Sequence, residues 1–179
     1  MTRVRDAVGR LAVDADRVAA DDHRELMSRF PAGVAIVTTA DRDGVPYGLT
    51  CTAFASVGLD PPTLLVCLHR DSRTLRALRS RGAFAVHLLD ADSADTAASF
   101  AERDGDPFAV VAWAPSARFG IPIVSGRTVG HAECVVAGST DASDHVVVFG
   151  EVVATSLGAG DPMVYGLREF VRWPGRPAS

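Results

Sequence analysis

The chain has 179 residues, of which 47% are apolar and 22% charged, and its formal net charge is −4. This length suits one domain with a sizeable core, and the composition is that of an ordinary globular protein. An acidic net charge argues against a general nucleic-acid-binding function. No apolar run is long enough for a membrane span, and residues 1–10 lack the apolar segment of a secretory signal, so we expect a cytoplasmic protein.

Residue chemistry excludes several further classes. The three cysteines, Cys51, Cys67 and Cys134, are odd in number and show no C-x-x-C spacing, so we expect reduced thiols and no disulfide framework. All 18 basic residues are arginine, which rules out a Schiff-base or P-loop lysine. The chain has no G-x-S-x-G, H-E-x-x-H or G-x-G-x-x-G motif, which argues against a nucleophile elbow, a zinc-protease site and a Rossmann site.

A helix is predicted at the start of the domain. Asp22 and Glu25 have the spacing of a capping box, and the helix stops before Pro31 because proline disfavours a helical residue before it. Its inward side chains are expected to be Leu26, Met27 and Phe30. We expect residues 1–20 to form an arm or a loosely docked helix, residues 21–173 one domain, and residues 174–179 a tail.

Apolar and β-branched runs bounded by turn residues predict strands in the rest of the chain. The expected strands are residues 34–39, 47–52, 64–68, 83–89, 133–137 and 145–156. Two more helices are expected, at residues 74–81 with Ser72 as cap and Leu75 and Leu78 inward, and from Asp92 or Ser93 to Arg103. Residues 108–122 are expected to be loop-like and residues 138–144 a turn. Hairpins of this kind favour a mainly β fold, an antiparallel barrel with a few covering helices, over a doubly wound parallel sheet.

Residues 48–62 form the stretch around which the rest is organised, and we read them as a strand and the loop that follows it. The hydroxyls of Thr50, Thr52 and Ser56 lie between two apolar runs, with no acid or base before Asp60. Backbone N–H groups and short hydroxyls can bind the polar edge of a ligand, but they cannot carry out proton chemistry. The stretch therefore predicts a binding segment without a catalytic side chain.

A second polar segment, Ser72-Arg73-Thr74, precedes a predicted helix. Hydroxyls beside an arginine at a helix start can bind a phosphate through backbone N–H groups, the helix dipole and the guanidinium. The alternative is a simple N-cap beside a surface arginine, which the segment alone favours. Together with residues 48–56, both interpretations stay open.

Two groups suggest metal sites but have simpler explanations. His131 and Cys134 have the spacing of one ligand pair, yet no second pair follows, so no metal site is predicted. Asp90, Asp92 and Asp95 are more typical of helix capping and solvation than of a cation site.

Two further side chains have no clear chemical role in the sequence. Cys51 has no neighbour in sequence that would lower its pKa, so a small buried residue is expected. His145, beside Asp144, either hydrogen-bonds a ligand at the barrel mouth or is a strand-end histidine without a role, and the sequence alone favours the latter.

Short motifs follow one another in order along residues 25–173. They are residues 30–39, 48–57, 60–62, 72–75, 83–88, 99–101, 120–123, 132–134, 144–145 and 149–152. In their order and spacing they resemble the flavin reductase-like family, which has the FMN-binding split-barrel fold. The similarity is strongest to the reductase components of two-component flavin-dependent monooxygenases.

The resemblance implies a homodimeric split barrel that binds FMN or FAD and takes hydride from NADH or NADPH. It places the flavin ring and ribityl chain along Thr50, Cys51, Thr52, Ala53 and Phe54. It places the phosphate at Ser56, Val57, Ser72 and Arg73. The nicotinamide side comprises His145, Tyr165 and Phe170. It implies no catalytic side chain and no metal, because the cofactors carry the chemistry.

The chain departs from the family pattern at two positions, with Ser143 in place of the usual glycine before Asp144 and Ala53 in place of Asn or Ser. The implied function is that of an NAD(P)H:flavin oxidoreductase supplying reduced FMN or FAD to a partner flavin-dependent monooxygenase. The alternatives are a tight flavoprotein that reduces a ferric chelate, a nitro compound or a quinone, and a non-catalytic flavin-binding protein. The residues do not decide between FMN and FAD, or between NADH and NADPH.

Overall fold

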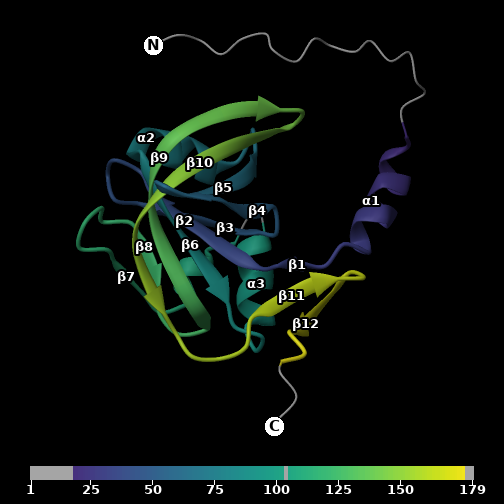
Figure 1. Ribbon diagram of the computed structural model, residues 1–179. Helices are drawn as coiled ribbons and strands as arrows, with labels where there is room; N and C mark the ends of the chain where they lie inside the picture. The colour runs from purple at the N-terminus through teal and green to yellow at the C-terminus, as the bar shows by residue number, and fades with distance from the viewer. Residues whose placement is uncertain (1–17, 103–104, 176–179) are drawn as a thin grey trace.

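Figure 1 shows the computed structural model, which describes residues 18–102 and 105–175. Its helices are α1 (Ala20–Ser28), α2 (Arg73–Arg81), α3 (Ala94–Ala101) and the 3-10 helix η1 (Pro107–Ala109). Its strands are β1 (Ala32–Gly33), β2 (Ala35–Ala40), β3 (Pro46–Cys51), β4 (Phe54–Leu59), β5 (Pro62–His69), β6 (Ala83–Leu89), β7 (Trp113–Pro115), β8 (Pro122–Val124), β9 (Thr128–Ala142), β10 (His145–Leu157), β11 (Met163–Gly166) and β12 (Glu169–Arg172).

The main sheet has seven antiparallel strands in the order β3-β2-β6-β9-β10-β5-β4. Its two edge strands, β3 and β4, are consecutive in the chain and are joined only by Thr52 and Ala53. The sheet must therefore curl until its edges meet, which makes a barrel that is open along one line. We call residues 50–54 on this line the seam. The predicted antiparallel barrel with covering helices is confirmed.

Both faces of β2 are buried, which explains its run of β-branched residues. Successive side chains of a strand point to opposite faces. Ala35 and Val37 join the cluster inside the barrel with Phe84, whereas Ile36 joins a second cluster outside it with Phe100. The second cluster packs α3 and β8 onto the barrel wall.

Several predicted boundaries differ from the structure. Residues 54–59 were expected in a loop but form β4, whose small and polar residues lack the apolar alternation of a half-buried strand. The predicted turn at residues 138–144 is wrong, because β9 continues to Ala142 and only Ser143 and Asp144 form the turn. The last four residues of β9, 139–142, are exposed, so their polar sequence resembles a turn. Residues 108–122 are not purely loop-like, since they include η1, β7 and the start of β8.

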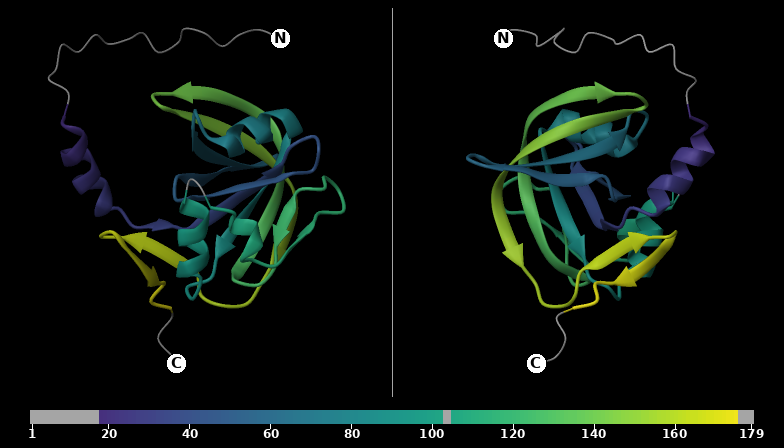
Figure 2. Two further views of the ribbon diagram at one scale, coloured as in Figure 1. Left: turned by 180° about the vertical axis from the view of Figure 1, so that it is seen from behind. Right: turned by 45° about the vertical axis from the view of Figure 1, so that its right-hand side comes forward.

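The first helix differs most from its prediction. It begins at Ala20, with Ala19 as a cap that makes no side-chain hydrogen bond, so Asp22 lies inside the first turn and the predicted capping box is wrong. Its three predicted inward side chains are also exposed: Leu26, Met27 and Phe30. Figures 1 and 2 show the reason, because α1 projects from the barrel and does not pack on it. The predicted arm, residues 1–20, lies almost wholly outside the described residues.

The helices that cover the barrel agree better with the sequence. The hydroxyl of Ser72 accepts a hydrogen bond from the Leu75 N–H at 3.3 Å, as a cap of α2 should, and Leu75 and Leu78 are buried. The third helix ends at Ala101; Arg103, its expected end, lies outside the described residues. Ser93 stands at its start, but its hydroxyl donates to the Arg127 carbonyl and does not cap the helix.

A buried histidine, His87, lies between the barrel wall and β8. Thr38 donates its hydroxyl to the Pro122 carbonyl at 2.6 Å, so it accepts from His87 Nε2–H at 3.0 Å. The second ring nitrogen, Nδ1, is buried without a hydrogen-bond partner among the described residues. Burial, with a smaller contribution from His131, lowers the pKa of His87 to about 3.

This histidine predicts acid sensitivity of the fold. The unfolded chain protonates His87 near pH 6.5 and the folded chain only near pH 3, so its contribution to stability is lost as pH falls through this window. We expect about 2 kcal/mol less unfolding free energy from this group at pH 5 than at pH 7. Urea unfolding of His87→Gln should show a shallower pH dependence than the wild type. The exposed His23→Gln serves as the control, and identical slopes for wild type and His87→Gln would contradict the prediction.

Candidate functional site

The seam leaves backbone groups available to a ligand. Within the described part of the chain, β3 pairs only with β2 and β4 only with β5, so one side of each strand takes no part in a ladder. Thr52 and Ala53, which join these strands, are exposed. The Cys67 N–H donates to the Ala53 carbonyl at 2.8 Å and fixes this linker against β5. A ligand with a polar edge can therefore bind here through the main chain.

Two side chains at the seam serve the fold. The Thr50 hydroxyl donates to the Ala97 carbonyl at 2.6 Å and so holds α3 against β3. Cys51 is buried, and its thiol lies 3.5 Å from the Ala53 carbonyl oxygen. Burial raises the pKa of Cys51 to about 11, so the thiol is neutral at pH 7. The expectation of a small buried cysteine is confirmed.

An open cavity of about 360 Å³ adjoins β4. Phe54, Ala55 and Ser56 of β4 line it. The remaining wall is mostly apolar and includes Leu59, Leu64, Leu88, Val152 and Leu157. Val57 does not line the cavity and is exposed. The cavity can therefore take an apolar group beside the seam.

The start of α2 offers an anion site. The Ser72 hydroxyl accepts from the Leu75 N–H and still has its own hydrogen to donate. Arg73 is the first residue of the helix and is exposed, and the first turn of α2 contains no acidic residue. The positive end of the helix dipole and a guanidinium thus coincide, which suits a phosphate.

The structure brings His145 to the same region. His145 pairs with His69 at the end of β5, their rings lie 5.4 Å apart, and the Ser72 N–H donates to the His69 carbonyl. Nδ1 of His145 lies 2.8 Å from the Asp144 carboxylate, and this hydrogen bond holds the pKa of Asp144 below its usual value. His69 is a residue that the sequence did not single out, because only strand register places it there. Ser143 takes φ 56°, so it adopts the left-handed turn in which glycine is usual.

The other two predicted nicotinamide contacts lie elsewhere. Tyr165 and Phe170 are cross-strand neighbours on β11 and β12, with ring centroids 5.1 Å apart. Figure 1 shows this hairpin well apart from the tip of the β9–β10 hairpin, where His145 lies. One chain therefore does not bring these three residues together.

The predicted phosphate contacts are divided in the same way. Ser56 pairs with Leu64, whereas Ser72 follows the end of β5 at His69. Five residues of strand separate Leu64 from His69, or roughly 16 Å. Ser56 and Val57 thus lie away from Ser72 and Arg73 within one chain, and the seam residues are nearer to α2.

The groups that suggested metal ligands do not converge. His131 and Cys134 are three residues apart on β9, so they face opposite sides of the strand. Asp92 accepts from Arg172 at 2.6 Å, and Asp90 accepts from the Asp92 N–H. Among residues 18–102 and 105–175, no three His, Cys, Asp or Glu side chains gather to hold a metal ion. In the same residues no helix is long and apolar enough to cross a membrane.

Comparison with known proteins shows which family has this sequence and fold. Residues 27–174 match the model of the flavin reductase like domain. The chain belongs to the flavin reductase-like family. It is 46% identical over 159 residues to the flavin reductase (NADH) of Kitasatospora aureofaciens, covering 88% of this chain and 83% of that protein. It is 45% identical over 167 residues to the flavin reductase (NADPH) of Lentzea aerocolonigenes, covering 91% and 98%.

A solved structure also resembles the fold of this chain. Nitrilotriacetate monooxygenase component B from Mycobacterium thermoresistibile superposes with a TM-score of 0.80 at 34% identity, covering 89% of this chain and 93% of that chain. The resemblance to split-barrel flavin reductases, and to reductase components of two-component systems, is thus confirmed.

Proposed function

We propose that the protein is an NAD(P)H:flavin oxidoreductase that supplies reduced FMN or FAD to a partner flavin-dependent monooxygenase. Near full-length identity of 45% or more to two proteins named flavin reductase carries this proposal. Similarity to a monooxygenase component B supports a partner oxygenase. Because NAD(P)H is a cytoplasmic reductant, we place the enzyme in the cytoplasm.

The residues present fit a flavin. The seam offers main-chain groups at Thr52 and Ala53 for the polar edge of the ring, and the start of α2 offers Ser72 and Arg73 for the phosphate. Ser56 lies too far from Ser72 to share one phosphate with it, so we assign the phosphate to Ser72 and Arg73, where the helix dipole and a guanidinium coincide.

The chain itself contributes position and charge. The bound flavin and nicotinamide supply the hydride-transfer chemistry. Backbone N–H groups at the seam orient the ring edge and stabilise negative charge there. His145, its ring fixed by Asp144, is placed to hydrogen-bond the nicotinamide amide. No proton donor or acceptor is needed, which agrees with a seam whose only titratable side chain, Cys51, stays protonated.

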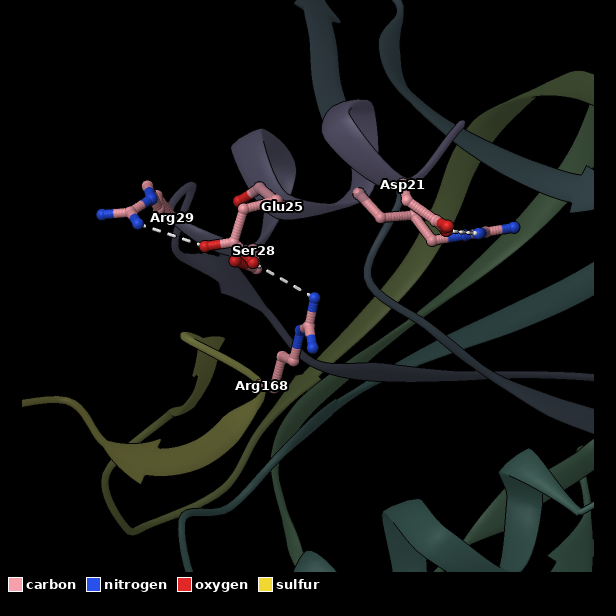
Figure 3. A network of polar contacts seen from close by, with 6 residues as sticks. Asp21, Glu25, Ser28, Arg29 and Arg168 are labelled. Carbon is pink, nitrogen blue, oxygen red and sulfur yellow. Dashed lines mark hydrogen bonds and ion pairs between the residues drawn. The ribbon is translucent and has the colours of Figure 1, made fainter. Parts of the chain in front are cut away.

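A homodimer completes the proposal, and α1 supports it. All nine residues of this helix, which lie within the described part of the chain, are exposed or half-buried. Figure 3 shows the ion pair that joins it to the β11–β12 turn, in which Glu25 accepts from Arg168 at 3.2 Å, while the pairs Glu25–Arg29 and Asp21–Arg24 lie within the helix itself. The Leu167 N–H also donates to the Ser28 carbonyl at 2.6 Å. A nine-residue helix is marginal in water without a packing partner.

Exposed apolar side chains lie on α1, on the β11–β12 hairpin and on the residues directly after each of them. In the single chain nothing among the described residues covers them. They are Leu26, Met27, Phe30, Leu167, Phe170, Val171 and Trp173. A second copy is the occupant we propose. Its β9–β10 hairpin would bring its His145 toward Tyr165 and Phe170, which one chain keeps apart.

The test is steady-state oxidation of NADH and NADPH with and without added FMN or FAD. Oxidation that depends on added flavin is expected. Purified protein that keeps its flavin through desalting and reduces another acceptor would favour a tight flavoprotein. Flavin binding without oxidation of either nucleotide would overturn the enzyme proposal.

His145→Ala separates nicotinamide contact from flavin binding. Loss of one hydrogen bond to the nicotinamide should raise the KM for NADH about tenfold, while the Kd for flavin changes less than about twofold. Flavin titration and NADH kinetics on the same preparation measure both. Arg79→Ala, at an exposed position of α2 outside the proposed sites, is the control. Equal losses of flavin and NADH affinity would contradict the assignment.

A further inference from the structure

A hollow of about 250 Å³ lies between α2 and the turn that joins β2 to β3. Its walls are Asp41, Tyr47, Arg73, Arg76, Ala77 and Ser80. The four helix residues have the spacing i, i+3, i+4, i+7 and so form one stripe of α2. The stripe begins at Arg73, the residue that also stands at the proposed flavin phosphate site.

The polar groups of the hollow have a defined arrangement. Asp41 Oδ1 accepts from the N–H groups of Asp43 at 3.0 Å and Val45 at 2.9 Å, which fixes the turn. Its Oδ2 lies 3.4 Å from the Tyr47 hydroxyl and can accept further hydrogen bonds. Two arginines, Arg73 and Arg76, line the hollow together with this one carboxylate.

These groups match one kind of ligand fragment. Guanidiniums bind phosphate oxygens, a carboxylate oxygen accepts from ribose hydroxyls, and the half-buried Tyr47 offers a ring on which a base can stack. The volume is smaller than that of a typical pocket for a whole ligand. A hollow of this size suits one end of a longer molecule.

We propose that this hollow binds the adenosine-phosphate end of a dinucleotide. The inference rests on the proposed function, in which two such molecules take part, FAD and NAD(P)H. Arg73 favours FAD, because its adenylate is joined to the flavin phosphate and must start where that phosphate binds. The chain would then prefer FAD to FMN.

The experiment measures binding directly. Titrations of FMN, FAD, NADPH and AMP into the apoprotein at fixed ionic strength should be made with wild type, Arg76→Ala and Ser80→Trp. Arg76→Ala removes a charge from the hollow, and Ser80→Trp fills it. Arg79→Ala, on the same helix but outside the hollow, is the matched control. Circular dichroism checks the fold of each variant.

We expect both hollow variants to raise the Kd for FAD about tenfold and the Kd for FMN less than about twofold. AMP should compete with FAD in the wild type only. If NADPH weakens instead of FAD, the hollow binds the adenylate of the nicotinamide dinucleotide. Unchanged binding of FAD, NADPH and AMP in both variants would overturn the inference while FMN binding persists. Loss of the proposed function itself would appear differently, as a wild type that binds no flavin.

Discussion

Gly150→Ala should lower the unfolding free energy by about 3 kcal/mol, at the upper end for an overpacked core. A Cβ at this position of β10 would lie 2.4 Å from Phe84 Cζ and 2.8 Å from Cys134 Cβ. Phe84 and Cys134 are both fully buried inside the barrel, so neither can move aside into solvent. Urea or thermal unfolding measures the change.

The same hairpin provides the control. Gly138 on β9 has no atom within 4 Å of an added Cβ among the described residues, so Gly138→Ala should be nearly neutral. Adding Phe84→Leu to Gly150→Ala should recover part of the loss, because the shorter side chain removes the contact at 2.4 Å. Equal stability of Gly150→Ala and Gly138→Ala would contradict the packing argument.

Local sequence signals predicted the covering elements and most strands. Ser72 predicted the start of α2, and the β-branched run predicted β2, because capping and periodicity act within a few residues. β4 was missed because an edge strand at the seam is stabilised by pairing with β5 and needs no apolar alternation of its own. The exposed apolar face of α1 was read as inward, since the sequence does not show which surface an amphipathic helix meets.

At the candidate site, too, the sequence identified segments but not how they lie relative to one another. The sequence identified the seam and the start of α2 as binding segments, and the structure places both near the end of β5. It could not show that Ser56 and Ser72 lie apart, or that His69 stands beside His145, because strand register decides both. Within residues 48–62, the seam is the part that lies near α2. It offers a ligand main-chain groups and no catalytic side chain.

Disruption of the proposed dimer should abolish activity without unfolding the chain. Leu26 and Phe30 are 65% and 64% exposed, so Leu26→Glu with Phe30→Glu removes no buried contact of the single chain. Light scattering should show the wild type at twice 18.8 kDa and the variant at 18.8 kDa. NADH oxidation should fall about 100-fold, because half of each nicotinamide site is lost. Val110→Glu, 73% exposed and remote in sequence, is the control.

Complementation between variants tests the shared site itself. His145→Ala and Phe170→Ala each remove one contact, and in the dimer we propose the two contacts at one site come from different copies. Mixed one to one, half of the dimers combine both variants, and each of these has one complete site. Below the KM for NADH, the mixture should therefore regain about a quarter of wild-type activity above the separate variants. No gain on mixing, in a protein that exchanges subunits, would show that His145 and Phe170 do not serve one site.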